Sequence, residues 1–222
     1  MNDVKILWKC AVPVIGGLMG ATYLDAGVTL QPVSVIAYAP MGQFDNASFS
    51  ATNLINQSGL VVGYTSGITD FASYIASNPI DNKSPGYWAS TAGNTTGILE
   101  FDLGSLAMIQ SFALWNNGGG SNHNIIGFDL VGDADGDFNT GSVSLLIGQN
   151  ANPNTGAFLE TLPEVFTFAP TEVRYVRMII SSNNGNTTFT QAAEVMFEQV
   201  PEPTVASLTL ASMVFLLRRC RR

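Results

Sequence analysis

The sequence predicts an all-β sandwich for the body of the chain, residues 28–199. Runs of alternating apolar and polar residues recur along this body, and clusters of Gly, Asn, Asp and Ser separate them. A helical period is visible only over Ala51–Gln57. Many short strands joined by polar turns, with no repeat of fixed length, are typical of a sandwich. A jelly roll and an immunoglobulin-like sandwich fit this pattern equally well.

The clearest strand is Gly97–Gly104, in which Leu99, Phe101 and Leu103 alternate with acidic residues. Because successive side chains of a strand point to opposite faces, we expect the apolar face to lie in the core. We expect Gly104 to allow a sharp turn out of the strand. The same pattern predicts further strands at Ile109–Trp115, Ile125–Val131, Val143–Ile147, Val173–Ile180 and Ala193–Phe197.

Two arginines lie in one of these strands. Arg174 and Arg177 are three residues apart, which places them on opposite faces of an ideal strand. We therefore expect one to be exposed or at an edge. The other should pair with a carboxylate such as Asp102 or Asp129, since an unpaired buried charge is costly.

The body is large enough for one domain, and it is strongly acidic. Residues 28–200 contain three basic and fourteen acidic residues, a net charge of about −11. This charge repels phosphate backbones and anionic lipids, so nucleic acid is not an expected partner. Cys10 and Cys220 both lie outside the body, which is therefore expected to fold without disulfides.

The beginning of the chain has the layout of a secretory signal. Lys5 and Lys9 precede a mostly apolar stretch, Cys10–Leu24. We place the signal peptide at residues 1–27, with cleavage within 21–27. The export machinery is accordingly an expected partner, and the membrane should contact only the terminal segments.

The last segment, residues 200–222, joins a Pro-Glu-Pro motif, an apolar run over Val205–Leu217 and an arginine cluster. As a helix the apolar run spans about 20 Å, which is shorter than the hydrocarbon core of about 30 Å. The positive-inside rule predicts that the arginines stay cytoplasmic and that the body is translocated. An ordinary single-pass anchor is one interpretation of this segment, and a transmembrane sorting helix that is later removed is the other.

The order of these three features resembles the PEP-CTERM sorting signal of Gram-negative bacteria. The matching residues are Pro201, Glu202, Pro203, Arg218, Arg219, Arg221 and Arg222. The resemblance implies an exosortase as processing partner, cleavage near the Pro-Glu-Pro motif and a transient inner-membrane intermediate. It further implies delivery to the cell surface or the extracellular matrix.

The motifs of the body follow a characteristic order. They are NLIN from Asn53, WAS from Trp88, ILEFDLG from Ile98, FALWN from Phe112, GFDLVGDADGDF from Gly127, RYVRMIISSNNGN from Arg174 and AEVMF around Glu194. This order resembles the discoidin, or coagulation factor type C, domain, a galactose-binding-like jelly roll. The chain departs from that family in having about thirty residues between the first two motifs, Asn56 in place of an Asp, and no matching disulfide.

The resemblance also implies a structural calcium site. Relatives hold Ca²⁺ with a loop near the first motif and the Glu of the closing strand. The corresponding residues here are Asn56, Asp81 and Glu194.

A second set of possible calcium ligands is Asp133, Asp135 and Asp137, whose carboxylates alternate around Gly136. The loop is not an EF-hand, because Gly is at its fourth position and Ser144 is at its twelfth. A solvated acidic turn is the alternative interpretation.

The loop that contains the only histidine is a candidate glycan site. Its amides and imidazole are groups that hydrogen-bond sugar hydroxyls, and the candidates are Asn116, Asn117, His123 and Asn124. A flexible turn is the simpler interpretation of the same Gly- and Asn-rich segment.

A glycan site also needs an apolar wall, which aromatic rings commonly provide. Trp88 and Trp115 lie beside strand patterns, so we expect them in the core. Tyr64, Phe71 or Tyr74 from the insertion would then supply a ring that stacks on the sugar.

The sequence gives little support for catalysis. It lacks a G-x-S-x-G elbow, a P-loop, a dinucleotide fingerprint and a zinc pattern. Acidic residues are numerous, but no spacing singles out a hydrolytic pair. We expect a non-catalytic surface or matrix protein that binds carbohydrate, with exopolysaccharide or another glycan as partner. A purely structural or adhesive surface protein is the alternative, and a hydrolase is a remote third.

Overall fold

The computed structural model describes residues 27–45, 47–82, 86–116, 122–153 and 161–200. The predicted signal peptide, apart from Gly27, lies outside these ranges, as do Asn117 and the sorting segment from Pro201 onward. Within the described ranges, no helix is long and apolar enough to cross a membrane.

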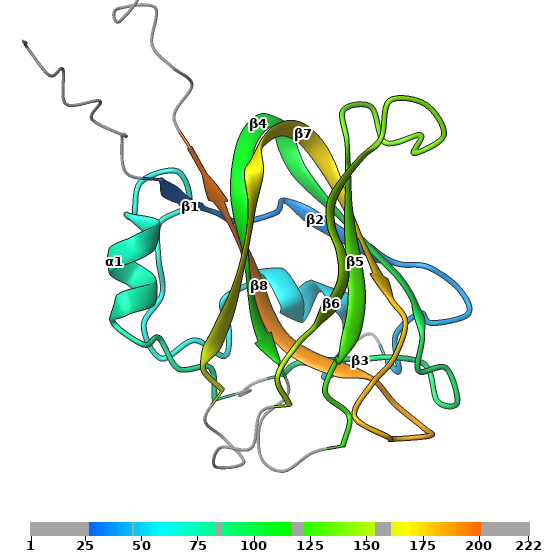
Figure 1. Ribbon diagram of the computed structural model, residues 1–222. Coiled ribbons are helices and arrows are strands. Elements are labelled where there is room, and N and C mark those ends of the chain that lie inside the picture. Colours follow the sequence, from blue (N-terminus) through cyan, green and yellow to red (C-terminus); the bar gives the residue numbers. More distant parts are fainter. Residues whose placement is uncertain (1–26, 46, 83–85, 117–121, 154–160, 201–222) are drawn as a thin grey trace, which may run out of the picture.

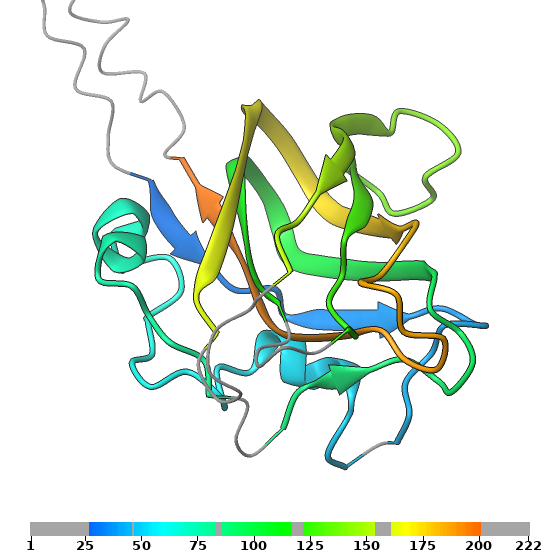
Figure 2. The same ribbon diagram turned by 60° about the horizontal axis from the view of Figure 1, so that its bottom comes forward.

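Eight antiparallel strands form the fold, with two short helices beside them (Figures 1 and 2). The strands are β1 (Val28–Leu30), β2 (Ser34–Ala37), β3 (Trp88–Ala89), β4 (Gly97–Asn116), β5 (Gly127–Asp133), β6 (Val143–Asn150), β7 (Pro163–Ile180) and β8 (Gln191–Gln199). A 3₁₀ helix, η1 (Ala51–Ile55), and an α-helix, α1 (Phe71–Ala76), complete it. The strand order is β1-β8-β4-β7-β5-β6, with β2 beside β4 and β3 beside β8.

The long strands β4 and β7 bend and belong to both layers of the sandwich (Figure 1). The first half of β4 pairs with β2 and with the second half of β7, which also pairs with β5. The second half of β4 pairs with β8 and with the first half of β7. Such sharing of strands between layers is found in jelly rolls, and the predicted all-β sandwich is confirmed.

Several strand boundaries differ from the prediction. Gly104 does not end its strand: at φ 89° it lies in a register shift between Asp102 and Ala107, so two expected strands form one β4. Strand β7 begins at Pro163, ten residues before the expected start. Strands β1 and β2 and helix α1 were not predicted from the sequence.

The main core fills the space between the layers. Leu99, Phe101 and Leu103 are buried as predicted, and Trp88 is also fully buried. Phe112 lies at the centre of a cluster of rings, with centroids 6.0 Å from Phe128, 6.3 Å from Phe166 and 5.4 Å from Phe197.

A smaller core lies on the outer face of β4 and β8. Its members are Tyr64, Phe71, Tyr74, Ala113, Trp115, Ala193 and Met196. The second half of β4 and nearly all of β8 are therefore buried on both faces, because the insertion that carries α1 covers them (Figure 1). Trp115 is anchored there by a hydrogen bond of 2.8 Å from its indole N–H to the Pro79 carbonyl.

The predicted pairing of one arginine with Asp102 is confirmed, and the second arginine is ion-paired as well. Arg174 donates to both carboxylate oxygens of Asp102, at 2.9 and 3.0 Å, and Arg177 donates to Glu100 at 2.7 Å. The burial alternation of β7 slips at Arg174 and Tyr175, opposite the register shift in β4. This irregularity places each arginine beside its own carboxylate on β4, Arg174 beside Asp102 and Arg177 beside Glu100.

Candidate functional site

An aromatic pocket of about 280 Å³ opens beside the start of β8. We call it the aromatic pocket, and the residues that line it are Phe44, Phe49, Tyr87, Ala89, His123, Phe189 and Gln191. They come from the segment between β2 and η1, from β3 and the residue before it, from the loop that precedes β5, and from the first residue of β8 with the loop before it. Four sequence-distant segments therefore build one concave surface.

Backbone hydrogen bonds hold the first wall of the aromatic pocket. The Phe44 amide donates to the Ala89 carbonyl at 2.8 Å, and the Ala89 amide donates to the Phe49 carbonyl at 3.3 Å. Between the two phenylalanines, the Asp45 carboxylate accepts from the Phe49 amide at 2.9 Å. These contacts keep the Phe44 and Phe49 rings in an edge arrangement with centroids 5.6 Å apart.

The opposite wall is a turn shaped by asparagine side chains. Asn186 accepts from the Phe189 amide at 2.7 Å, and Asn183 donates to the Phe189 carbonyl at 2.9 Å. The Phe189 ring then meets Phe44 edge-on at 5.2 Å and the His123 ring at 6.2 Å. The Asn-rich stretch from residue 181 thus forms an ordered support for Phe189.

The polar groups of the aromatic pocket are positioned by β8. The Gln191 amide donates to the His123 carbonyl at 2.9 Å. Burial raises the pKa of Tyr87, and a hydrogen bond with the Gln191 side chain opposes this shift. None of the seven lining residues is Lys, Arg, Asp or Glu. The pocket therefore offers aromatic edges, an imidazole and an amide to a ligand.

Of the four predicted ligand residues, His123 is the one that lines the aromatic pocket. Asn116 is 4% exposed; its side chain accepts from the Ile125 amide at 2.9 Å and donates to the Ile125 carbonyl at 2.7 Å. Asn124 is fully buried, and Asn117 lies outside the described residues. Asn116 therefore fixes the loop that carries His123.

The rings expected to stack on a sugar belong to the core. Tyr64, Phe71 and Tyr74 are all less than 10% exposed and pack in the smaller core, because α1 turns its apolar side toward β4 and β8. The rings of the aromatic pocket come from other segments. Phe44 and Phe49 flank a turn without strand patterning, so no periodic signal marks them in the sequence.

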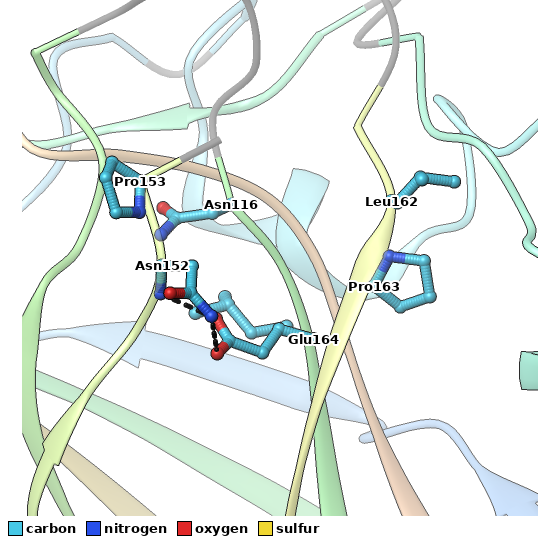
Figure 3. Close-up of a pocket in the computed structure, with 7 residues that line it drawn as sticks. Asn116, Asn152, Pro153, Leu162, Pro163 and Glu164 are labelled. Atoms are coloured by element: carbon cyan, nitrogen blue, oxygen red, sulfur yellow. Dashed lines mark hydrogen bonds between the residues drawn. The ribbon is translucent and has the colours of Figure 1, made fainter. Parts of the chain in front are cut away.

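A second cavity, of about 340 Å³, lies near the end of β4 and the start of β7 (Figure 3). Its main polar groups already bind each other: Asn152 donates to Glu164 from its backbone at 2.8 Å and from its side chain at 2.6 Å (Figure 3). Asn116, which also lines it, is engaged with Ile125. This cavity is therefore a weaker candidate than the aromatic pocket.

Two carboxylates, those of Asp81 and Glu194, are fully buried. Glu194 belongs to β8, and Asp81 is near enough for its charge to act on Glu194. Glu194 Oε2 accepts from the Gln57 amide at 2.9 Å, whereas Oε1 is buried without a hydrogen-bond partner among the described residues. Burial raises the pKa of Glu194 well above its usual range, and the charge of Asp81 raises it further. Two of the three residues predicted as calcium ligands are thus brought together.

The third predicted ligand, Asn56, is exposed at the end of η1. Its side-chain oxygen accepts from the Ser58 amide at 2.9 Å, and its nitrogen donates to Asn53 at 3.1 Å. The next residue, Gln57, supplies the amide that reaches Glu194. The loop lies against the carboxylate pair, although the Asn56 side chain is used within its own turn.

Asp133, Asp135 and Asp137 are also brought together, in the loop between β5 and β6. One carboxylate oxygen from each lies within 4.8 Å of the others. Burial raises the pKa of Asp133, but the amides of Gly136 and Asp135 outweigh this effect and the pKa is lowered overall. The amides of Thr140 and Asn139 lower the pKa of Asp137. Asp133 and Asp137 are therefore ionised at neutral pH.

The F5/8 type C domain family matches residues 65–195 of the chain. A search of the curated proteins found no match to the chain. Among solved structures, a pectin-binding carbohydrate-binding module shares 14% identity over 76% of this chain and 91% of its own, with a TM-score of 0.50.

Two further solved structures are similar to the chain. The family 32 carbohydrate-binding module of C. perfringens NanJ, in complex with galactose, shares 15% identity over 78% of this chain and 98% of its own, with a TM-score of 0.49. Chitosan-binding module 1 of the Paenibacillus sp. IK-5 chitosanase/glucanase shares 13% identity over 77% and 97%, also with a TM-score of 0.49. At such identities the likeness concerns the fold.

Proposed function

Because the chain belongs to the F5/8 type C domain family, we propose that it is a non-catalytic protein that binds carbohydrate through the aromatic pocket. The observation that carries this proposal is the arrangement of four aromatic rings around about 280 Å³, with His123 and Gln191 at their margin. Sugars present C–H faces that pack on rings and hydroxyls that hydrogen-bond imidazole and amide groups. The similar fold of a carbohydrate-binding module supports a carbohydrate as the class of ligand, without indicating which sugar.

The lining of the aromatic pocket favours uncharged sugars. None of its seven residues is a lysine or arginine that would pair with a uronate. Both arginines of the described chain are committed to Asp102 and Glu100. The net negative charge of the body also repels polyanionic glycans. We therefore expect neutral hexoses and their N-acetyl derivatives to bind better than uronic acids.

A glycan array with the full-length chain tests the proposal. Phe189→Ala and His123→Ala should each weaken binding of the best glycan about tenfold or more, corresponding to about 1.4 kcal/mol. Leu162→Ala, in the second cavity, is the matched control and should leave binding unchanged. Silence of the wild-type chain across neutral and acidic glycans would instead favour a structural or adhesive role. Turnover of a polysaccharide that is lost on changing one carboxylate would indicate a hydrolase.

Asp81 and Glu194 are proposed to hold a structural Ca²⁺, with Asn56 as a further ligand from the adjoining loop. The residues fit a hard cation, because both carboxylates are buried, the charge of Asp81 acts on Glu194, and one oxygen of Glu194 has no hydrogen-bond partner in the described chain. A bound cation would supply the positive charge that this buried pair needs. Its role would be to fix the insertion against β8.

The terminal segments are proposed to direct export and sorting. A signal peptide at residues 1–27 and the PEP-CTERM-like motif around Glu202 would bring the body to the cell surface or matrix after exosortase processing. Intact-mass measurement of the surface form tests this. A mature protein that ends before the apolar run is expected. A surface form that still carries Arg222 would favour an ordinary membrane anchor.

A further inference from the structure

The β5–β6 loop gathers three carboxylates at the end of the sandwich opposite β3 (Figures 1 and 2). Its backbone is shaped around Gly136, at φ 85°, whose Cα lies over the Tyr175 ring: an added Cβ would meet ring atoms at 3.1 Å. Phe138 lies under the Arg177 guanidinium, which is 3.9 Å from the ring centroid. The loop is therefore held against β7 on two sides.

Asp133 is the buried member of this loop, at 2% exposure. Its Oδ1 accepts from the amides of Asp135 and Gly136, at 2.8 and 2.7 Å. Its Oδ2 is buried and has no hydrogen-bond partner among the described residues. Asp133 therefore has one buried and unsatisfied carboxylate oxygen, and its carboxylate lies beside those of Asp135 and Asp137, with one oxygen from each within 4.8 Å of the others. Such an arrangement is costly unless a cation completes it.

The basic side chains of the described residues do not supply that cation. Arg177 lies beside the loop but donates to Glu100, and Arg174 donates to Asp102. The carboxylates of Asp133, Asp135 and Asp137 therefore lie together without an ion pair to an arginine of the described chain. Since the described part of the chain supplies no further basic side chain here, a cation from solution is the natural source of the positive charge.

We propose that the β5–β6 loop binds a hard divalent cation, with Ca²⁺ as the natural occupant, through Asp133, Asp135 and Asp137. The three carboxylates supply part of the six to eight oxygens that Ca²⁺ takes, and backbone carbonyls and water supply the others. This site is separate from the carboxylate pair behind β8. It also lies at the end of the sandwich opposite β3, whose Ala89 lines the aromatic pocket (Figure 1).

Terbium luminescence gives a readout specific to this loop, because Tyr175 packs on it and can sensitise a bound Tb³⁺. Full-length chain carrying Glu194→Gln is titrated with Tb³⁺, so that the carboxylate pair does not contribute, and Ca²⁺ is then added in competition. Tyrosine-excited emission that Ca²⁺ displaces is expected. Tyr175→Phe should remove most of this emission while leaving Ca²⁺ affinity, measured by calorimetry, within about twofold.

Asp133→Asn is the decisive variant, because its Oδ1 can keep both amide hydrogen bonds while the negative charge is lost. Affinity for Tb³⁺ and Ca²⁺ should fall at least tenfold. Asp137→Asn, at an exposed position, should also lower the affinity at least tenfold, and it replaces Asp133→Asn in the test if that variant does not fold. Glu172→Gln removes an equal charge from exposed β7 and should change affinity less than twofold. Tb³⁺ emission that is absent, or unchanged by both aspartate variants, would overturn the proposal.

Discussion

Replacing Glu194 by glutamine is expected to alter how calcium affects the stability of the fold. In the absence of metal, Glu194 is a fully buried carboxylate beside Asp81, with Oε1 unpartnered among the described residues. Glutamine has the same shape, and its oxygen can still accept from the Gln57 amide. Since an uncompensated buried charge costs several kcal/mol, the variant should unfold at the same temperature as the wild type or higher in chelator.

When calcium is added, the wild type should unfold at a higher temperature than Glu194→Gln. A ligand at one hundred times its Kd stabilises the folded state by about 2.7 kcal/mol. For a domain of this length, about 2–4 °C accompanies each kcal/mol, so the melting temperature should rise by about 5–11 °C. Glu194→Gln should lose this part of the response. Any contribution of the β5–β6 loop remains in both proteins and cancels in the comparison.

The measurement is calorimetric unfolding of both proteins with excess chelator and with saturating calcium. Glu198→Gln is the matched control, because this second carboxylate on β8 is already satisfied by Gln110 at 2.9 Å and Ser111 at 2.5 Å. It should destabilise the fold equally with and without calcium. Equal calcium-induced shifts in the wild type and Glu194→Gln would refute the reasoning.

Three substitutions test the fold itself. Asp102→Asn should cost about 1 kcal/mol or less, because Arg174 is 39% exposed. The hydrogen bond from Arg174 lowers the pKa of Asp102 below its ordinary 3.8. The ion pair therefore contributes its full stability above pH 3.8 and loses it as the pH falls through the lowered pKa. Identical acid unfolding curves for the wild type and Asp102→Asn would contradict this. Trp115→Phe should cost about 1–3 kcal/mol in urea unfolding, since the Pro79 carbonyl loses its donor. Phe112→Ala should cost about 3–5 kcal/mol, far more than Phe44→Ala at a 50% exposed position.

Residue periodicity predicted the centre of the fold well. The alternation around Phe101 identified the inner face of β4, and the burial of Trp88 followed from its place beside strand patterning. The short edge strands β1 and β2 were missed because three or four residues carry too little pattern to be recognised. The extra length of β7 was missed because residues 163–172 are mostly exposed or half-buried and lack a clean alternation.

The candidate site was predictable only in part. His123 was recognisable as a unique titratable side chain in a polar loop, but the rings around it come from segments as distant as Phe44 and Phe189. Their meeting depends on pairing between strands, which one sequence does not reveal. Asp81 and Glu194 were identified through the family resemblance, and only the fold shows that both are fully buried.

Strand β8 runs from the aromatic pocket to the part of the fold where the described chain begins and ends. Gln191, at its start, lines the aromatic pocket, and Gln199, at its end, pairs with Val28. Nine residues of extended chain span about 26 Å at about 3.3 Å per residue. If the protein is attached to a surface through the segment before β1 or the segment after β8, the aromatic pocket would therefore lie at the far end of β8 from the attachment point. The proposed processing of the terminal segments would then release the body with the aromatic pocket, the proposed glycan site, unchanged.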